Sequence, residues 1–202
     1  MKKIIVILLI SVLLISALCL LLASCSCINF KELGNLIKSV EKTKTYPDMT
    51  DEEVLALEDE EFHNAVYMKL FNKVEESGSI DVLNEYQLAY FVVWEFDMEI
   101  QNGGLCQYFC NSSGENAEYV EYGLKTLSFD KTAELFKKFV TENNIDLSIF
   151  DNEINYDDYD SYLKKYDFDK FDDEYMELYD SEQIYENMIK FAREHYEEME
   201  LS

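Results

Sequence analysis

Residues that interrupt helices are scarce in this sequence, which has one proline, Pro47, and six glycines among 202 residues. Proline and glycine mark turns and breaks, so their scarcity favours long helical segments. Runs that alternate between apolar and polar residues are also few, and such runs are what a half-buried β-strand needs. These absences predict an all-α protein, built as a single compact multi-helix domain after an N-terminal apolar segment.

Positive charge is the second thing the chain has little of. It holds 17 Lys and Arg against 42 Asp and Glu, for a formal net charge of −25. A chain with this charge repels nucleic acid and attracts basic proteins or cations. High charge is typical of disorder, but 48% hydrophobic and 14% aromatic residues are enough to build a core. We therefore expect a folded acidic domain that binds a basic protein and makes no direct contact with nucleic acid.

Motifs of catalysis are missing as well. The sequence contains no Gly-x-Ser-x-Gly, no phosphate-binding loop and no His-Glu-x-x-His. Its two histidines, His63 and His195, lie far apart on charged segments, and we interpret both as surface residues. The acidic stretch 167–173 lacks the spacing of an EF-hand. We expect no catalytic residue, no metal site and no cofactor.

The long apolar run lies at the N-terminus, where Lys2 and Lys3 precede an uncharged stretch. This run ends in Leu22-Ala23-Ser24-Cys25, which resembles the lipobox of bacterial lipoproteins, with Cys25 as the lipidation site. About 20 helical residues also span a bilayer core, so an uncleaved transmembrane anchor stays open. Either reading places the domain at a cell membrane, and the resemblance to the lipobox implies an exported, lipid-anchored bacterial protein.

We divide the chain into three parts. Residues 1–24 are the signal peptide or membrane anchor, 25–49 a tether, and 50–202 the all-helical acidic domain. Within the domain, Thr50-Asp51-Glu52-Glu53 is a capping box that begins a helix. A second helix ends near Ser77-Gly78. Further helices are predicted at 84–102, 106–110, 115–127 and 130–143, in a pattern around 159–178, and from a Ser181 cap to about residue 200, with 144–156 as a loop.

The predicted helix 84–102 is apolar around most of its circumference, so we expect it at the centre of the domain. A polar motif follows it, made of Asn102, Gly103, Gly104, Gln107, Tyr108, Asn111, Ser112, Ser113 and Gly114. We interpret the glycines as a tight corner, with Gly103 in the left-handed cap position at the end of helix 84–102, and the amides as caps for helix ends. The alternative is a polar pocket lined by these side chains, which an enzyme could use. Cys106 and Cys110 are interpreted as small buried apolar residues, since a disulfide between them would strain a helix.

The segment 94–114 resembles the all-helical bacterial domain family that is named after a DNA-mimic protein. The family is marked by Asn-Gly-Gly, then Gln, an aromatic pair and Asn-Ser-Ser-Gly, and the similarity covers about residues 82–197. Leu105 departs from the family, which usually carries an aromatic residue there. The resemblance implies an all-helical fold and a partner whose nucleic-acid-binding site is blocked. It implies no catalytic residue.

Acidic residues near the C-terminus form the second candidate site. We assign an acidic face to Asp172, Asp173, Glu177, Glu194, Glu197 and Glu198. Glu194 and Glu198 would form a like-charge i,i+4 pair at the end of the last helix, at a cost of about 0.2–0.5 kcal/mol. The helix dipole disfavours acids there too, which suggests a use for them. A solvated, solubilising face explains the same residues equally well.

The leading prediction is therefore a non-enzymatic, membrane-tethered acidic binding module that occupies a basic surface of a partner protein. Two alternatives stay open. One is a structural cell-envelope lipoprotein without a dedicated partner, and the other is an enzyme that uses the polar motif Asn102–Ser113. A homodimer also stays open.

Overall fold

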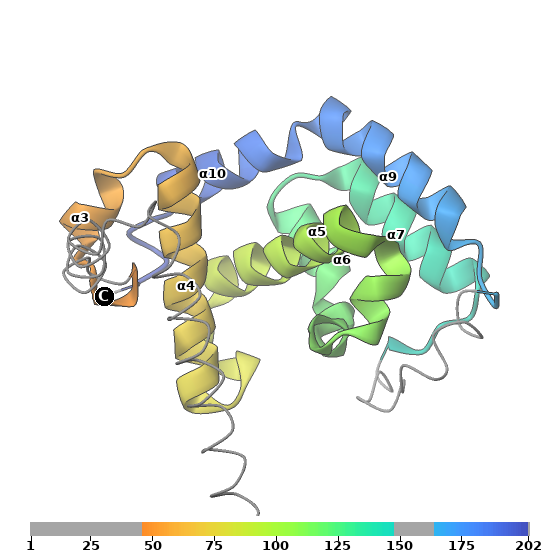
Figure 1. Cartoon of the computed structure of the whole chain (residues 1–202), viewed down its shortest axis with the longest axis horizontal. Coiled ribbons are helices and arrows are strands. Elements are labelled where there is room, and N and C mark those ends of the chain that lie inside the picture. Colours follow the sequence, from red (N-terminus) through yellow and green to blue (C-terminus); the bar gives the residue numbers. More distant parts are fainter. Residues whose placement is uncertain (1–45, 148–163, 202) are drawn as a thin grey trace, which may run out of the picture. The chain divides into compact units, whose positions relative to one another are not determined.

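The computed structural model describes residues 46–147 and 164–201 (Figure 1). Over these two ranges the secondary structure is helical and contains no strand, which confirms the predicted all-α fold. None of the helices in them is long and apolar enough to cross a membrane. Residues 1–24, Cys25 and most of the predicted tether lie outside the described residues, as does the helical pattern before Lys164.

The elements follow one another in the order η1 (Tyr46–Asp48), α3 (Asp51–Leu55), α4 (Asp59–Ser77), η2 (Ile80–Val82), α5 (Glu85–Cys110), η3 (Ser112–Tyr119), α6 (Val120–Thr126), α7 (Asp130–Glu142), α9 (Phe168–Glu182) and α10 (Ile184–Glu194), where η denotes a 3-10 helix. The predicted helix 115–127 is in fact divided. Its first part is the 3-10 helix η3 and only its second part, α6, is α-helical.

Local signals set the ends of the first helices. At the start of α3 the Thr50 hydroxyl accepts a hydrogen bond from the Glu53 N–H at 3.3 Å, and the Glu53 carboxylate accepts one from the Thr50 N–H at 2.8 Å. This reciprocal pair is the predicted capping box. Helix α4 ends at Gly78, whose φ of 72° lies in the left-handed region that glycine adopts without strain. Both predicted boundaries are confirmed.

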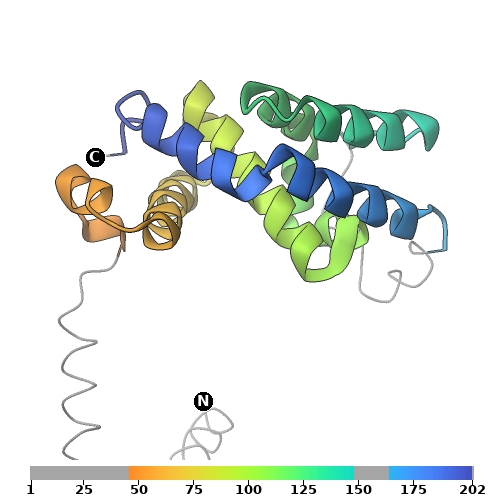
Figure 2. The same cartoon turned by 90° about the horizontal axis from the view of Figure 1, so that it is seen from above.

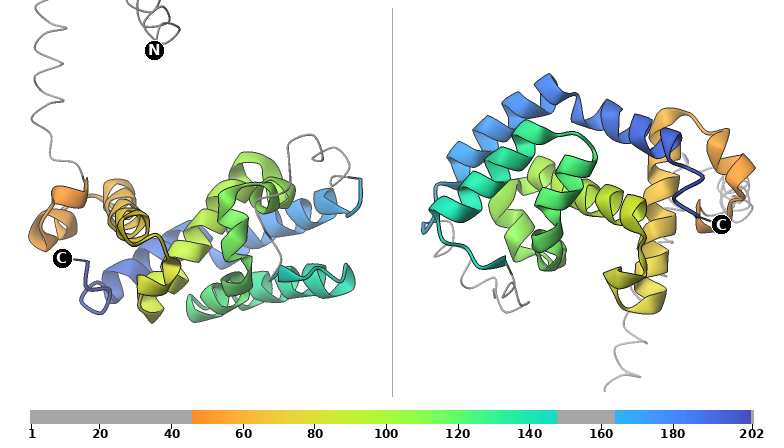
Figure 3. Two further views of the ribbon diagram at one scale, coloured as in Figure 1. Left: turned by 90° about the horizontal axis from the view of Figure 1, so that it is seen from below. Right: turned by 180° about the vertical axis from the view of Figure 1, so that it is seen from behind.

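Helix α5 lies at the centre, as predicted, and contacts α4, η3, α6 and α9. The part of α5 before Gly103, called its first arm below, buries side chains on nearly every side, among them Tyr90, Phe91, Val93 and Phe96. Figure 2 shows α9 and α10 following one another across α5, with a bend between them. Figure 3 adds the views from below and from behind, in which α6 and α7 lie beside α5.

A kink divides α5 at two glycines. Gly103 (φ −165°, ψ 20°) and Gly104 (φ 80°, ψ 176°) are non-helical, and helical geometry resumes after them as far as Cys110. The sequence predicts a left-handed glycine at Gly103, but Gly104 is the residue that adopts it. Gly104 also leaves room for Asp172 of α9, because a Cβ built on Gly104 would lie 2.2 Å from the Asp172 Oδ2 atom.

The C-terminal helices differ from the prediction at both ends. Ser181 does not cap the last helix: it lies inside α9, and the chain breaks at Gln183, whose φ is 48°. Helix α10 then ends at Glu194, so Glu197, Glu198 and Glu200 lie beyond it. The predicted like-charge pair of Glu194 and Glu198 on one helix is therefore wrong. The Glu198 carboxylate instead lies 3.8 Å from the His195 ring.

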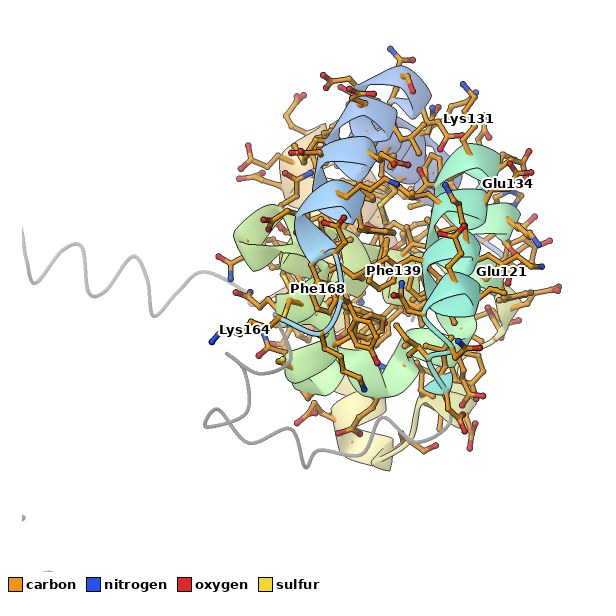
Figure 4. All side chains as sticks on the ribbon, turned by 90° about the vertical axis from the view of Figure 1, so that its right-hand side faces the viewer. Glu121, Lys131, Glu134, Phe139, Lys164 and Phe168 are labelled. Carbon is orange, nitrogen blue, oxygen red and sulfur yellow. The ribbon has the colours of Figure 1, made fainter. Side chains whose placement is uncertain are left out.

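Aromatic contacts and a carboxylate cap join α7 and α9. Phe139 of α7 and Phe168 of α9 lie close together between the helices (Figure 4), and their ring centroids are 5.4 Å apart. At the other end the Glu182 carboxylate accepts hydrogen bonds from the backbone N–H groups of Lys131 and Thr132, both at 3.1 Å. A carboxylate at a helix N-terminus satisfies free N–H groups and complements the helix dipole.

Candidate functional site

The amides of the polar motif converge on one carboxylate, that of Glu99 in the first arm of α5. Its Oε2 atom accepts hydrogen bonds from Gln107 Nε2 at 2.7 Å and from Asn111 Nδ2 at 2.8 Å. Its Oε1 atom accepts one from the Ser113 hydroxyl at 3.2 Å. The interpretation of the amides as helix caps is wrong for Gln107 and Asn111, because both donate to Glu99 and Asn111 makes no side-chain cap at the start of η3.

The kink is what makes this convergence possible. A Cβ built on Gly103 would lie 2.0 Å from Gln107 Oε1, so the glycine leaves room for the amide to fold back toward Glu99. Gly114 allows a second close approach, because a Cβ there would lie 2.7 Å from the carbonyl oxygen of Tyr108. The glycines of the motif thus permit close packing around the polar cluster, as the predicted tight corner requires.

A second carboxylate, Glu95, lies one helical turn before Glu99. It accepts a hydrogen bond from Asn116 Nδ2 at 3.2 Å and another from the Tyr67 hydroxyl. The pKa of Glu95 is raised to about 7, chiefly by burial and also by the Glu99 carboxylate, although the bonds from Asn116 and Tyr67 oppose the shift. Both partners are neutral, so they stabilise the ionised carboxylate less than a cation would.

The Tyr108 hydroxyl completes this group. Its side chain is fully buried, and the hydroxyl has no hydrogen-bond partner among the described residues. Burial raises the pKa of Tyr108 well above its ordinary value, and the Glu95 and Glu99 carboxylates raise it further. The hydroxyl therefore lies within electrostatic range of both acids.

A cleft of about 470 Å³ lies beside Glu95, between α4, η2, α5 and η3. Its apolar wall includes the rings of Phe71, Phe91 and Tyr119, and its polar wall includes Ser112, Ser113 and Asn116. Five acids also line it, namely Glu75, Asp81, Glu95, Glu115 and Glu118. No described Lys or Arg does. The cleft therefore combines aromatic surface with negative charge.

The remaining predicted motif residues divide between surface and interior. Asn102 is exposed at the kink and does not line the cleft, whereas Ser112 is exposed and does. No disulfide joins Cys106 and Cys110, and of the two residues interpreted as buried, Cys106 is buried and Cys110 half-buried. The motif therefore builds a carboxylate–amide network, with the cleft on one side of it.

The six residues of the predicted acidic face do not form one surface. Asp172 is half-buried and its Oδ1 atom accepts a hydrogen bond from the Leu105 N–H at 2.8 Å. Asp173 and Glu177 are exposed on α9, in register with Asp169. Three further exposed acids, Glu194, Glu197 and Glu198, lie at the end of α10 and just beyond it.

Sequence reasoning missed the acids that α5 withdraws from solvent. Glu95 and Glu99 are half-buried, and Asp97 is 3% exposed and accepts a hydrogen bond from the Tyr175 hydroxyl at 2.6 Å. Burial raises the pKa of Asp97, although the bonds from Tyr175 and Gln101 oppose the shift. The available signal was composition: acids inside the most apolar helix must find hydrogen-bond donors, because burying an unpaired charge is expensive.

The histidine prediction was wrong for His63, which is 1% exposed. Its Nδ1 atom shares a hydrogen bond with the Tyr90 hydroxyl, and its ring lies edge-on to Trp94 with centroids 3.9 Å apart. Burial lowers the pKa of His63 to about 4. His195 is half-buried and stacks on Tyr86. A charged helix can thus bury the one histidine that falls on its apolar stripe.

These features define an all-helical domain in which a glycine-kinked central helix holds buried carboxylates beneath an acidic exterior. The chain belongs to the family of DMP19-like proteins, whose model matches residues 81–195. The matched region runs from η2 to the end of α10 and includes the whole of the motif in α5 and η3. Searches of curated proteins and of solved structures found no match.

Proposed function

We propose that this chain is a non-enzymatic acidic binding module that occupies a basic surface of a partner protein in the manner of a DNA mimic. The observation that carries the proposal is a row of exposed carboxylates on α9, formed by Asp169, Asp173 and Glu177. None of the three forms an ion pair with another described residue. Membership of the DMP19-like family supports the same reading.

The spacing of this acidic row suits a basic groove. Residues four apart on a helix are separated by about 6 Å along its axis. One strand of duplex DNA carries a charge about every 3.4 Å, so the row has roughly half the linear charge of one strand. A row of this charge density attracts a basic surface that binds phosphates, even though the row does not copy the shape of a duplex. Because the charges are exposed, the attraction weakens as salt rises.

The membrane tether is part of the same proposal. The Leu22-Ala23-Ser24-Cys25 pattern supports lipidation at Cys25, which would hold the acidic domain at a membrane. Protease accessibility of the domain in intact spheroplasts tests this, with Cys25→Ala for comparison. Digestion from outside, together with loss of lipid labelling in the variant, supports an exported lipoprotein whose basic partner is extracytoplasmic. Protection of the wild-type domain would instead point to a cytosolic partner.

The binding proposal is tested by neutralising the three carboxylates of the acidic row. The full chain, solubilised in neutral detergent and immobilised, is compared with the triple variant Asp169→Asn, Asp173→Asn, Glu177→Gln. The control is Glu52→Gln, Glu60→Gln, Glu61→Gln, which removes the same charge from exposed positions on α3 and α4.

We expect the partner protein bound to the immobilised chain to elute with salt and with duplex DNA. The α9 variant should no longer bind this partner, whereas the control variant should still bind it. The chain itself repels DNA, so DNA that displaces the partner acts by occupying the partner's site. Binding that withstands high salt, or that both variants lose equally, contradicts the proposal.

A further inference from the structure

The cleft beside Glu95 is not used by the proposed function, because it shares no residue with the acidic row on α9. It lies between α4, η2, α5 and η3, and its volume of about 470 Å³ falls in the range of small-molecule sites. We propose that this cleft binds one organic cation, a guanidinium or alkylammonium group, with Glu95 holding the charge and the aromatic wall packing against the attached hydrocarbon.

The charge of the walls selects the sign of the ligand. Five carboxylates line the cleft, and no described Lys or Arg does. Glu95 is half-buried, whereas the other four are exposed, and among the described residues its hydrogen-bond donors are the neutral groups of Asn116 and Tyr67. A half-buried carboxylate without a cationic partner is poorly compensated, so it gains more from an incoming cation than an exposed acid would.

The aromatic rings select an organic cation. Phe71, Phe91 and Tyr119 line the cleft, and Tyr67 stacks on Phe91 with centroids 5.7 Å apart. Aromatic faces attract guanidinium and ammonium groups and also bury the alkyl chain that carries them. Within residues 46–147 and 164–201 no group of three His, Cys, Asp or Glu side chains is placed to hold a metal ion.

The Tyr108 hydroxyl lies within electrostatic range of Glu95 and Glu99, but it is fully buried and does not line the cleft. Of the two carboxylates, Glu95 is the one that lines the cleft, and its donor Asn116 is neutral. Glu99, by contrast, is already occupied by Gln107, Asn111 and Ser113. Glu95 is therefore the carboxylate left for the ligand.

The first experiment is calorimetric titration of the full chain in zwitterionic detergent at about 150 mM salt, where weak surface attraction is screened. The probes are ethylguanidinium and, as its neutral counterpart of similar size, ethylurea. We expect saturable binding of ethylguanidinium at one site, and binding at least about tenfold weaker for ethylurea. Equal binding of the two probes would show that shape and not charge is recognised, and would overturn the proposal.

Variants test whether ethylguanidinium binds in the cleft beside Glu95. Glu95→Gln is expected to weaken ethylguanidinium binding at least about tenfold, whereas Glu85→Gln, an exposed acid at the start of the same helix, leaves it unchanged. Ser112→Lys keeps the Glu95 network and puts an ammonium group at the cleft, so it should also reduce binding. If Glu95→Gln and Ser112→Lys both bind as the wild type does, the proposal is wrong, whatever the fate of the α9 row.

Two sources could supply such a cation, and the same assay separates them. N-acetyl-argininamide represents an arginine side chain of a partner protein, and spermidine represents a free polyamine. Tighter binding of the first assigns the cleft to a protein side chain, and tighter binding of the second assigns it to a soluble amine. Failure of all cationic probes overturns the site but leaves the α9 proposal intact, because that one rests on other residues.

Discussion

Asp172 in α9 caps the second arm of α5, where its Oδ1 atom accepts a hydrogen bond from the Leu105 N–H at 2.8 Å. Leu105 follows the two non-helical glycines, so its N–H begins a new helical arm and has no partner in the preceding turn. The capping group thus comes from a helix that is distant in sequence. This contact ties the position of α9 to the conformation of the kink.

Substitution of Gly104 should therefore be strongly destabilising. Gly104→Ala places a Cβ at a φ of 80° and 2.2 Å from the Asp172 carboxylate, so it strains the backbone and displaces the cap. We expect a loss of about 2–4 kcal/mol in the free energy of unfolding, measured by urea titration of the full chain. Gly78→Ala is the control, because its φ of 72° is similar but nothing lies within 4 Å of the new Cβ. Its loss should be about 1 kcal/mol. Equal losses would refute a role for the Asp172 contact.

Glu95 should make the protein less stable as pH rises toward neutrality. Its pKa is raised from 4.5 to about 7 in the folded state, so between these values the folded chain holds a proton that the unfolded chain has released. Stability from this group is present below pH 4.5 and is lost as pH rises through 7. The loss is on the order of 1–3 kcal/mol. Glu95→Gln should remove this pH dependence. In urea titrations, the free energy of unfolding of the variant should therefore rise relative to that of the wild type between pH 5 and about 8. A constant difference across that range would contradict the assignment.

His63 should make the protein less stable as pH falls. Its pKa falls from 6.5 to about 4 on folding, so between these values the unfolded chain binds a proton that the folded chain does not. Stability from neutral His63 is present above pH 6.5 and is lost as pH falls through 4. His63→Gln keeps a polar side chain but cannot titrate. We expect it to be less stable than the wild type at pH 7 and to lose less on acidification. A parallel pH profile would show that His63 does not titrate as proposed.

The hydroxyl of Tyr175 should matter more at high pH than at low pH. It donates to the buried Asp97 carboxylate at 2.6 Å, while the other donor, Gln101 Nε2, is 3.4 Å away. Tyr175→Phe leaves the ionised carboxylate poorly compensated, which should cost about 1–3 kcal/mol. Protonation of Asp97 relieves this, so the loss should shrink on acidification. Tyr179→Phe, on the same helix and half-buried, serves as the control and should change stability by less than about 0.5 kcal/mol.

The features that sequence predicted are the ones that neighbouring residues determine. The Thr50 capping box, the Gly78 end of α4 and the apolar α5 each depend on residues within a few positions of one another. The close approach of Asp172 to Gly104 and its hydrogen bond with Leu105, 67 positions away, depend instead on how α9 packs against α5. No local pattern contains that information.

The candidate site was half predictable for the same reason. The polar motif was recognised, but its amides were assigned to helix ends because the acceptor, Glu99, precedes the glycines and looks like a surface acid in the sequence. The break between α9 and α10 at Gln183 was missed because a left-handed glutamine carries no signal, unlike a glycine. Ser181 offered a conventional cap nearby and was misleading.

The carboxylate–amide network around Glu99 joins residues that are close to one another in the sequence. Its three donors lie 8, 12 and 14 positions away along the chain, whereas the contacts of α9 with α5 close loops of 67 and 78 positions. Loop entropy makes each of the longer closures less favourable by roughly 1.5 kcal/mol. We therefore expect this hairpin-like segment to organise early in folding, so that α9 docks onto a corner already formed. Amide exchange in residues 95–116 should then be slowed before α9 is protected.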